Sequence, residues 1–289
     1  MNGKRPYKLP EPLLCSADKE INMTLVDEYI RKHEERMPRY RYLENLYKGF
    51  HDVFRLPEKE SWKPDNRLAV NFPRYITETF LGYAYGIPVK KSHPDEKIKD
   101  AILEFDRDND ISDQEYELVK KCCIYGHAFE YFYQDEEAKT KTVVCNPKEL
   151  FVVYDDTVKS RALFAVRYGK KDDNVTRYGE ILTRTEIIPF DGEKMQESIP
   201  NPYGRINCVE YVLNDERIGL YEEVAGMVET YNRVIGEKAN DVDSFAEAYL
   251  AVLGAELDEE GVYKIRDNRI INLYGTDNAK DIIVQFLGK

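Results

Sequence analysis

The chain has 289 residues, of which 42 are basic and 54 acidic, so its formal net charge is −12. This excess of acid argues against a protein that grips nucleic acid by neutralising phosphates, because that mode of binding needs clustered Lys and Arg. The composition, 42% hydrophobic with 22 tyrosines, is too apolar for a disordered chain. No apolar run reaches the roughly 18 residues that a membrane-spanning helix needs.

The first part of the chain predicts helices. Residues 1–14 lack an apolar signal core and are expected to form a loose arm. Apolar residues then recur at helical spacing over 24–50, which predicts a helix with Thr24 as its N-cap and a break at Pro38. After a polar loop, residues 68–89 predict a mostly apolar helix that Gly and Pro residues terminate.

The middle of the chain mixes helices with strands. Residues 95–133 predict two helices that flank the acidic loop DRDNDISD. Short segments of alternating character follow, each bounded by turn-forming residues, and these are typical of β-strands: HAFEYFYQD, TKTVVCN, LFVVYDD, LFAVRYG, NVTRYGEILTRTEIIPF and INCVEYVLN. Consecutive strands of this length favour antiparallel pairing, so the predicted fold class is α+β.

Residues 219–247 predict one long helix, about 40 Å at roughly 1.5 Å per residue. One side is apolar, and we expect it to be buried against protein: Leu220, Val224, Met227, Val228, Tyr231, Val234, Ile235, Val242 and Phe245. The segment holds seven acids and two bases, and hence a net charge of −5. Gly226 and Gly236 are expected to let another helix approach closely. The remaining residues, 248–289, predict short strands in AYLAVLG, GVYKIRD, RIINLYG and DIIVQFLG.

A calcium-binding loop is the nearest approach to a metal motif. Asp106, Asp108, Asp110 and Glu117 fit positions 1, 3, 5 and 12 of such a loop. Ile111 stands where the sharp turn of that loop needs Gly. A solvated loop between helices explains these acids better than a metal site does.

The cysteines do not form a recognisable framework. Five residues, Cys15, Cys122, Cys123, Cys145 and Cys208, are expected to be reduced and mostly buried thiols. The four histidines have no metal-ligand spacing among themselves or with cysteine. A nucleophilic pair of Cys122 or Cys123 with His127 is the one enzymatic alternative. We therefore predict no catalytic, cofactor-binding or metal-binding residues.

Four segments, in order along the chain, resemble the SPP1-type portal proteins of tailed bacteriophages. NFPRYITETFLGYAYGIPV resembles one family segment, and YGHAFEYFYQDEE with NPKELFVVYDD resembles the next. NPYGRINCVEYVLNDE then resembles the segment that precedes a long helix in the family, with Asn207 in place of the usual Pro. The helix itself resembles the family pattern Y-N-x-x-x-S-x-x-x-N-D-x-x-x-F, with Gly236 in place of Ser. The residues that match are Tyr231, Asn232, Asn240, Asp241 and Phe245.

The resemblance implies a structural protein, not an enzyme. Such proteins form a ring, usually of about twelve copies, at one vertex of the capsid, and DNA passes through the ring during packaging and ejection. The implied partners are further copies of the chain, terminase, head-completion or adaptor proteins, capsid and scaffolding proteins, and double-stranded DNA that passes non-specifically. No membrane partner or cofactor is expected. The implied location is the portal vertex of the virion, with assembly in the host cytoplasm or coding by a prophage.

The resemblance also assigns a role to each part of the chain. Residues 1–55 would form an N-terminal arm and helices, 56–218 the α+β wing domain, 219–247 the stem helix and 248–289 part of a β-rich clip. Family chains continue into the rest of the clip, a second stem helix, a tunnel loop and a crown, so this chain is expected to be C-terminally truncated.

The polar side of the stem helix would face the channel. The expected channel-facing residues are Glu222, Glu229, Arg233, Glu237 and Asn240. A ring of acidic helices repels phosphate, so DNA would slide through it instead of sticking. One alternative is a cytosolic scaffold that binds a partner through the helix 219–247. The Cys/His enzyme is a less favoured one.

Overall fold

The computed structural model describes residues 7–61, 63–173, 175–246, 249–253 and 283–287. Within it the chain divides into two compact units, each built from two stretches of sequence. Unit 1 comprises Met1–His51 and Val70–Val228, and unit 2 comprises Asp52–Ala69 and Glu229–Lys289. No helix among the described residues is both long and apolar enough to cross a membrane.

Two helices near the N-terminus confirm the predicted break. Helix α1 spans Met23–Glu34 and α2 spans Met37–Lys48, with Pro38 in the first turn of α2, where its missing N–H costs no hydrogen bond. The N-cap of α1 is Asn22 rather than Thr24, because the Asn22 side chain accepts a hydrogen bond from the amide of Leu25.

Three further helices of unit 1 follow. Helix α3 spans Phe72–Tyr85: it ends before Gly86, as predicted, but begins later than residue 68, since the Asn71 side chain caps its first turn. Helices α4 (Glu96–Asp108) and α5 (Ile111–Tyr125) confirm the pair predicted around the acidic loop.

The strands of unit 1 form two sheets. The larger sheet has the order β1-β4-β5-β6-β7-β8, with β9 also paired to β7. Its strands are β1 Leu13–Cys15, β4 Leu150–Asp155, β5 Ala162–Lys170, β6 Arg177–Leu182, β7 Glu186–Asp191, β8 Lys194–Met195 and β9 Ile199–Pro200. The smaller sheet has the order β10-β2-β3, from β10 Cys208–Val212, β2 His127–Gln134 and β3 Thr140–Cys145. Pairing is antiparallel as predicted, except that β1 from the N-terminal arm pairs parallel with β4.

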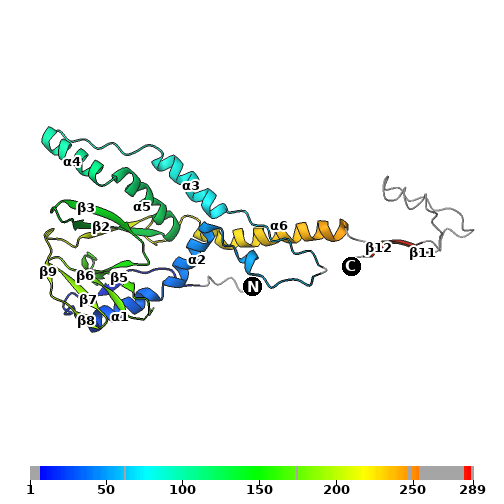
Figure 1. Cartoon of the computed structure of the whole chain (residues 1–289), viewed down its shortest axis with the longest axis horizontal. Coiled ribbons are helices and arrows are strands. Elements are labelled where there is room, and N and C mark those ends of the chain that lie inside the picture. Colours follow the sequence, from blue (N-terminus) through cyan, green and yellow to red (C-terminus); the bar gives the residue numbers. More distant parts are fainter. Residues whose placement is uncertain (1–6, 62, 174, 247–248, 254–282, 288–289) are drawn as a thin grey trace, which may run out of the picture. The chain divides into compact units, whose positions relative to one another are not determined.

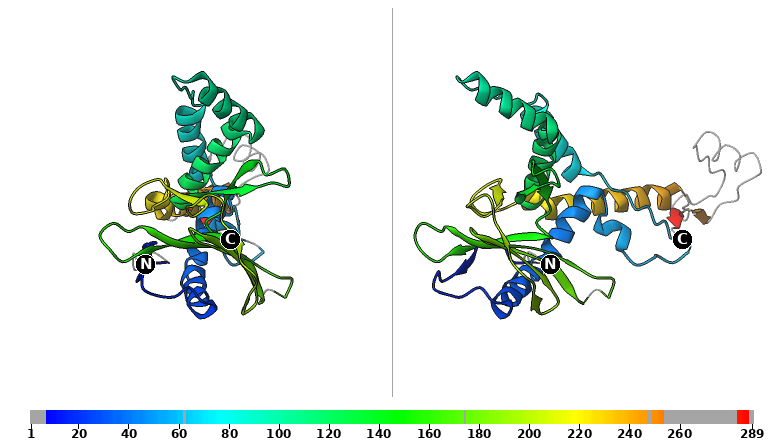
Figure 2. Two further views of the ribbon diagram at one scale, coloured as in Figure 1. Left: turned by 90° about the vertical axis from the view of Figure 1, so that its left-hand side faces the viewer. Right: turned by 60° about the vertical axis from the view of Figure 1, so that its left-hand side comes forward.

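The layers of unit 1 follow from the alternation of side chains along the central strand β4 (Figure 1 and Figure 2). Phe151 and Val153 point to one face of the larger sheet, where they pack with α1. Leu150 and Val152 point to the other face and pack against the smaller sheet. The far face of the smaller sheet packs on α5 around Cys122. Unit 1 is therefore a stack of helix, sheet, sheet and helices, which explains why β4 is apolar on both faces.

The outer edge of β3 is capped by side chains. The backbone amide of Thr142 donates to Asn109 Oδ1 at 3.0 Å, and the amide of Val144 donates to Gln114 Oε1 at 3.1 Å. Both side chains come from the α4–α5 region. They occupy groups that would otherwise invite pairing with another strand.

Unit 2 contains most of a long helix and a small β-ribbon. Helix α6 spans Ala225–Ala246, and its first residues belong to unit 1. The ribbon pairs β11 (Tyr249–Leu253) antiparallel with β12 (Ile283–Leu287), which confirms the first and last of the predicted C-terminal strands. The predicted strands GVYKIRD and RIINLYG lie outside the described residues.

Replacing Gly126 with alanine is expected to lower the free energy of unfolding by about 2–5 kcal/mol. Gly126 ends α5 with φ = 88°, and a Cβ built there would lie 1.9 Å from the carbonyl oxygen of Arg217. Urea denaturation measures the loss. Gly82→Ala in α3 is the control: its Cβ would meet nothing within 4 Å, and it should stabilise the protein by about 1 kcal/mol. Equal effects of the two substitutions would contradict this account.

Candidate functional site: helix α6 and its anchor

The long helix begins later than predicted. Residues 219–221 are not helical; Glu222–Val224 form one 3₁₀ turn and α6 starts at Ala225. The carbonyls of Gly219 and Tyr221 accept from the amides of Glu222 and Val224, three residues on and both at 3.1 Å, instead of from the amides four residues on that an α-helix would use. The amide of Leu220 donates to the carbonyl of Cys123 at 2.7 Å, and that of Gly219 to Glu222 Oε2 at 2.9 Å. We call this non-helical stretch, residues 217–224, the junction.

A buried ion pair anchors the junction. The guanidinium of Arg39, on α2, donates to both carboxylate oxygens of Glu222, with Nε to Oε1 at 2.8 Å. It also donates to the carbonyl oxygens of Tyr125 at 3.1 Å and Arg217 at 2.9 Å. Both charged side chains are at most 1% exposed. Tyr7 of the N-terminal arm also lies here, and burial together with the Glu222 carboxylate raises its pKa. The expectation that Glu222 belongs to an exposed polar face is wrong.

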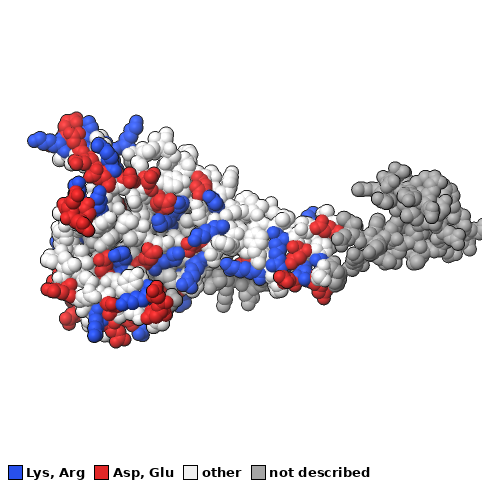
Figure 3. All heavy atoms as spheres, in the orientation of Figure 1, with Lys and Arg blue, Asp and Glu red and all other residues white. Residues whose placement is uncertain are grey.

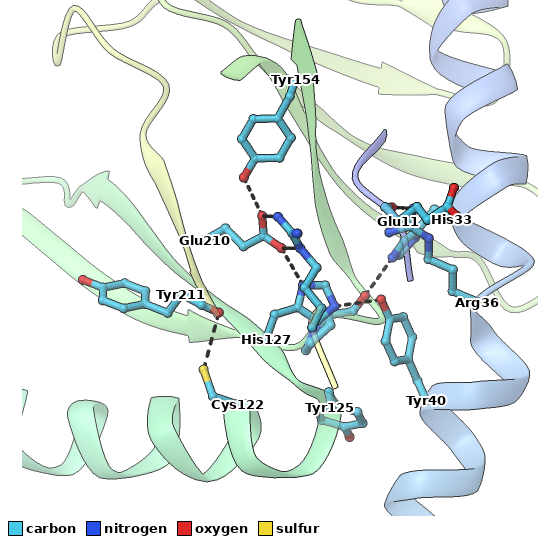
Figure 4. Close-up of polar contacts among 12 residues, drawn as sticks. Glu11, His33, Arg36, Tyr40, Cys122, Tyr125, His127, Tyr154, Glu210 and Tyr211 are labelled. Atoms are coloured by element: carbon cyan, nitrogen blue, oxygen red, sulfur yellow. Dashed lines mark hydrogen bonds and ion pairs between the residues drawn. The ribbon is translucent and has the colours of Figure 1, made fainter. Parts of the chain in front are cut away.

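A second buried cluster gathers around Glu210 and includes Arg217, the first residue of the junction (Figure 4). The Glu210 carboxylate accepts from Arg217 Nε at 2.8 Å and bonds His127 Nδ1 at 2.7 Å, and Tyr154 donates to it as well. His127 Nε2 bonds the hydroxyl of Tyr40 at 2.8 Å. Burial acts to raise the pKa of Glu210, but the hydrogen bonds from Arg217 and His127 bring it well below its usual range. The pKa of His127 is lowered, chiefly by burial.

This geometry opposes the Cys/His enzyme. Both ring nitrogens of His127 are engaged, by Glu210 and Tyr40. Burial raises the pKa of Cys122 and of Cys123 to about 12, so neither thiol is an activated nucleophile. The Cys122 thiol donates instead to the carbonyl of Tyr211 at 3.5 Å.

The acids of the calcium-like pattern do not converge. Asp106 pairs with Lys91 at 2.9 Å, and Glu117 pairs with Lys120. In the part of the chain that the structure describes, no group of three or more His, Cys, Asp or Glu residues could hold a metal ion.

One side of α6 is covered by residues 52–69, which we call the strap. The strap begins with a 3₁₀ turn, Asp52–Arg55. The amide of Asp52 donates to Glu229 Oε2 at 2.9 Å, the amide of Asn66 donates to Asn240 Oδ1 at 2.6 Å, and Lys59 pairs with Glu237 at 3.1 Å. The strap therefore contacts three of the five residues that were expected to face the channel.

Two family-signature residues of α6, and the glycine that replaces a third, explain how the strap fits. Asn232, Gly236 and Asn240 recur every four residues, so they share one side of the helix, and all three are buried. A Cβ at Gly236 would lie 2.8 Å from the carbonyl oxygen of Asn66. The close approach predicted at Gly236 is therefore made by an extended segment and not by a helix. The expectation that Asn240 lies on the exposed polar face is wrong, because its amide holds the strap.

The apolar side of α6 is exposed, which also differs from the prediction. Met227, Val234 and Val242 are 74%, 56% and 66% exposed, and Tyr231 is 47% exposed. These residues lie roughly opposite Gly236 around the helix, at about 100° per residue. Of the other predicted residues, Arg233 and Asp241 are exposed, and Phe245 lies in the last turn of α6. Four of the nine predicted apolar residues are thus exposed in the single chain, whereas Val228 is 6% exposed.

Removing the cation of the buried pair is expected to be costly. Arg39→Met leaves the Glu222 carboxylate buried without its partner, and should lower the free energy of unfolding by about 3–5 kcal/mol. The double variant Arg39→Met/Glu222→Gln should recover a large part of this loss, because no buried charge is left. Lys32→Met is the control, since it removes the cation of an exposed pair with Glu28 and should cost less than about 1 kcal/mol. Urea denaturation of the wild type and the three variants measures these free energies of unfolding. If the double variant is no more stable than Arg39→Met, the unpaired Glu222 charge is not the cause of the loss.

Gly236→Ala is expected to loosen the strap. The added methyl group would meet the Asn66 carbonyl, so the strap should exchange its amide hydrogens faster and be cut sooner by protease. Gly226→Ala is the matched change on the same helix, where a Cβ meets nothing within 4 Å, and it should leave strap exchange unchanged. Hydrogen exchange by mass spectrometry measures both. Equal protection of residues 52–69 in both variants would contradict the close contact.

Comparison with known proteins agrees with the resemblance found in the sequence. Residues 26–289 match the family described as "Phage portal protein, SPP1 Gp6-like". The portal protein of Bacillus phage SPP1 is 21% identical over 277 residues, an alignment that covers 85% of this chain and 54% of the relative. The chain thus spans about half the length of that relative. Since the family match extends over most of the sequence, the chain belongs to the SPP1 Gp6-like family of phage portal proteins.

Proposed function

We propose that this chain is part of a portal protein that assembles into a ring at one vertex of a phage capsid. DNA would pass through the ring during packaging and ejection, and terminase and head-completion proteins would dock on it. In this proposal unit 1 is the wing, α6 the first stem helix, and the β11–β12 ribbon the start of the clip. The chain acts as a structural conduit.

The observation that carries the proposal is the division of α6 into two different sides, in a chain of this family. One side holds the chain's own strap through polar and small residues, while the opposite side exposes Met227, Tyr231, Val234 and Val242. An apolar helical stripe of this length is typical of a surface that another helix or subunit covers. In a ring, neighbouring copies or a second stem helix would supply that cover.

Three of the five residues expected to face the channel are kept in this proposal. Glu222 and Asn240 are buried and are removed from it. We propose that Glu229, Arg233 and Glu237 lie toward the channel: Arg233 and Glu237 lie between the strap side and the apolar side, and Glu229 lies on the strap side. Of these Arg233 is exposed, and Glu237 remains half exposed while it pairs with Lys59.

Ring assembly is expected to depend on the apolar side of α6. In the intact portal protein, Val234→Glu should abolish rings seen by electron microscopy, because a carboxylate would have to be buried in the contact. Val158→Glu, the same substitution at a fully exposed loop residue of unit 1, should leave them. A ring reconstruction also tests the channel residues by showing which side of α6 lines the hole. An intact protein that forms only one-to-one complexes with a partner would favour the scaffold alternative and refute the ring.

A further inference from the structure

Helix α3 carries a second exposed apolar surface. Tyr75 and Tyr83 are 68% and 93% exposed, and Ile87, just past the end of the helix, is 80% exposed. Pro73, Thr77 and Leu81 form the buried side of α3. Tyr75 and Tyr83 are offset from that side by two residues, or about 200° around the helix, so they point away from unit 1. We call Tyr75, Tyr83 and Ile87 the α3 stripe. Figure 3 shows few charged side chains over α3, in contrast to α4.

A large groove lies in the same unit, between α3, α5 and the smaller sheet. Its volume is about 720 Å³, within the roughly 300–1,000 Å³ range of ligand-binding clefts. Phe80 and Tyr85 of α3, Leu118 of α5, and Phe132 and Tyr211 of the sheet contribute apolar walls. The helix α5 covers the sheet near Cys122, and the groove lies beside that contact.

The groove also has a charge preference. Two carboxylates, Glu115 and Glu130, line it against one ammonium group, Lys91. Lys91 pairs with Glu115 at 3.1 Å and with Asp106 at 2.9 Å, so its charge is already used. Glu130 accepts hydrogen bonds from Tyr211 and Thr142, both at 2.9 Å, and has no cation among its described partners. The groove therefore favours an apolar segment that brings a positive charge.

We propose that the α3 stripe of one copy packs into this groove on a second copy of the chain. The stripe ends beside Lys90, which is exposed, so it offers both the apolar side chains and the cation that the groove favours. A ring of identical subunits needs two different complementary surfaces on each copy, because every contact is head to tail. The α3 stripe and the groove are two such surfaces, and both belong to unit 1. This inference rests on the proposed ring and names a contact within it.

Photo-crosslinking tests the contact directly. Ile87 is replaced by p-benzoylphenylalanine in the full chain, and isotope-labelled and unlabelled copies are mixed so that cross-links between copies are recognised by mass. The cross-links are expected on groove residues of the other copy, within Glu130–Phe132 or Tyr211–Leu213. The inference is overturned if the cross-links between copies fall on α6, or if no cross-link between copies forms at all.

A matched pair of substitutions gives a second readout. Ile87→Glu should weaken association between copies about tenfold or more in sedimentation, since it would bury a carboxylate beside Glu130. Val158→Glu makes the same kind of change at a fully exposed aliphatic residue in a loop of unit 1 and should have no effect. Equal effects would refute the contact. If the intact portal protein forms closed rings but its cross-links fall elsewhere, this inference is refuted and the proposed function stands. If the stripe cross-links to the groove but no closed rings form, the contact stands and the proposed ring is refuted.

Discussion

One buried guanidinium fixes the start of the long helix. Arg39 binds the carboxylate of Glu222, a carbonyl at the C-terminus of α5 and a carbonyl of the junction, so three segments distant in sequence meet at one side chain. A buried ion pair adds little net stability, because desolvating two charges offsets their attraction. Its effect is on geometry: any arrangement that separates the pair leaves a charge buried without a partner. The junction is thereby held to α2 and to the C-terminus of α5, all within unit 1.

Local patterns predicted most of the elements. The break between α1 and α2 follows from Pro38, and the strands β2 to β5 and β10 follow from short strand-forming runs between turn residues. The segment NVTRYGEILTRTEIIPF, predicted as one element, contains both β6 and β7. The parallel pairing of β1 with β4 could not be predicted, because a strand of three residues in an arm carries almost no periodic signal. The start of α6 was misplaced for a related reason. The helical spacing continues through Leu220, but the carbonyls of Gly219 and Tyr221 bond to amides three residues on, and the Leu220 amide is held by the carbonyl of Cys123, far away in sequence.

The sides of α6 illustrate a different limit. A hydrophobicity pattern assumes that the covered side of a helix is the apolar one. The strap is an extended chain whose backbone N–H and C=O groups need polar partners, so the side that receives it is built from Asn232, Gly236 and Asn240. Asn232 and Asn240 match the family pattern and Gly236 stands in place of its Ser, and their spacing of four was visible in the sequence. What could not be seen was that a segment more than 150 residues earlier in the chain would bind there.

Ion pairs made by α2 and by the strap also change the electrostatic argument for a DNA channel. The sequence assigned a net charge of −5 to residues 219–247, but Glu222 is neutralised by Arg39 and Glu237 is paired with Lys59. Each copy therefore presents less negative charge than the count suggests. In the proposed ring this matters little, because rotational symmetry repeats every charge at the same height around the hole. A small net negative charge per copy becomes a belt of like charge, and DNA within about 10 Å of the wall would still be repelled. The weaker charge per helix has a compensating effect on assembly, because it lowers the repulsion between neighbouring copies that a fully charged helix would have to overcome.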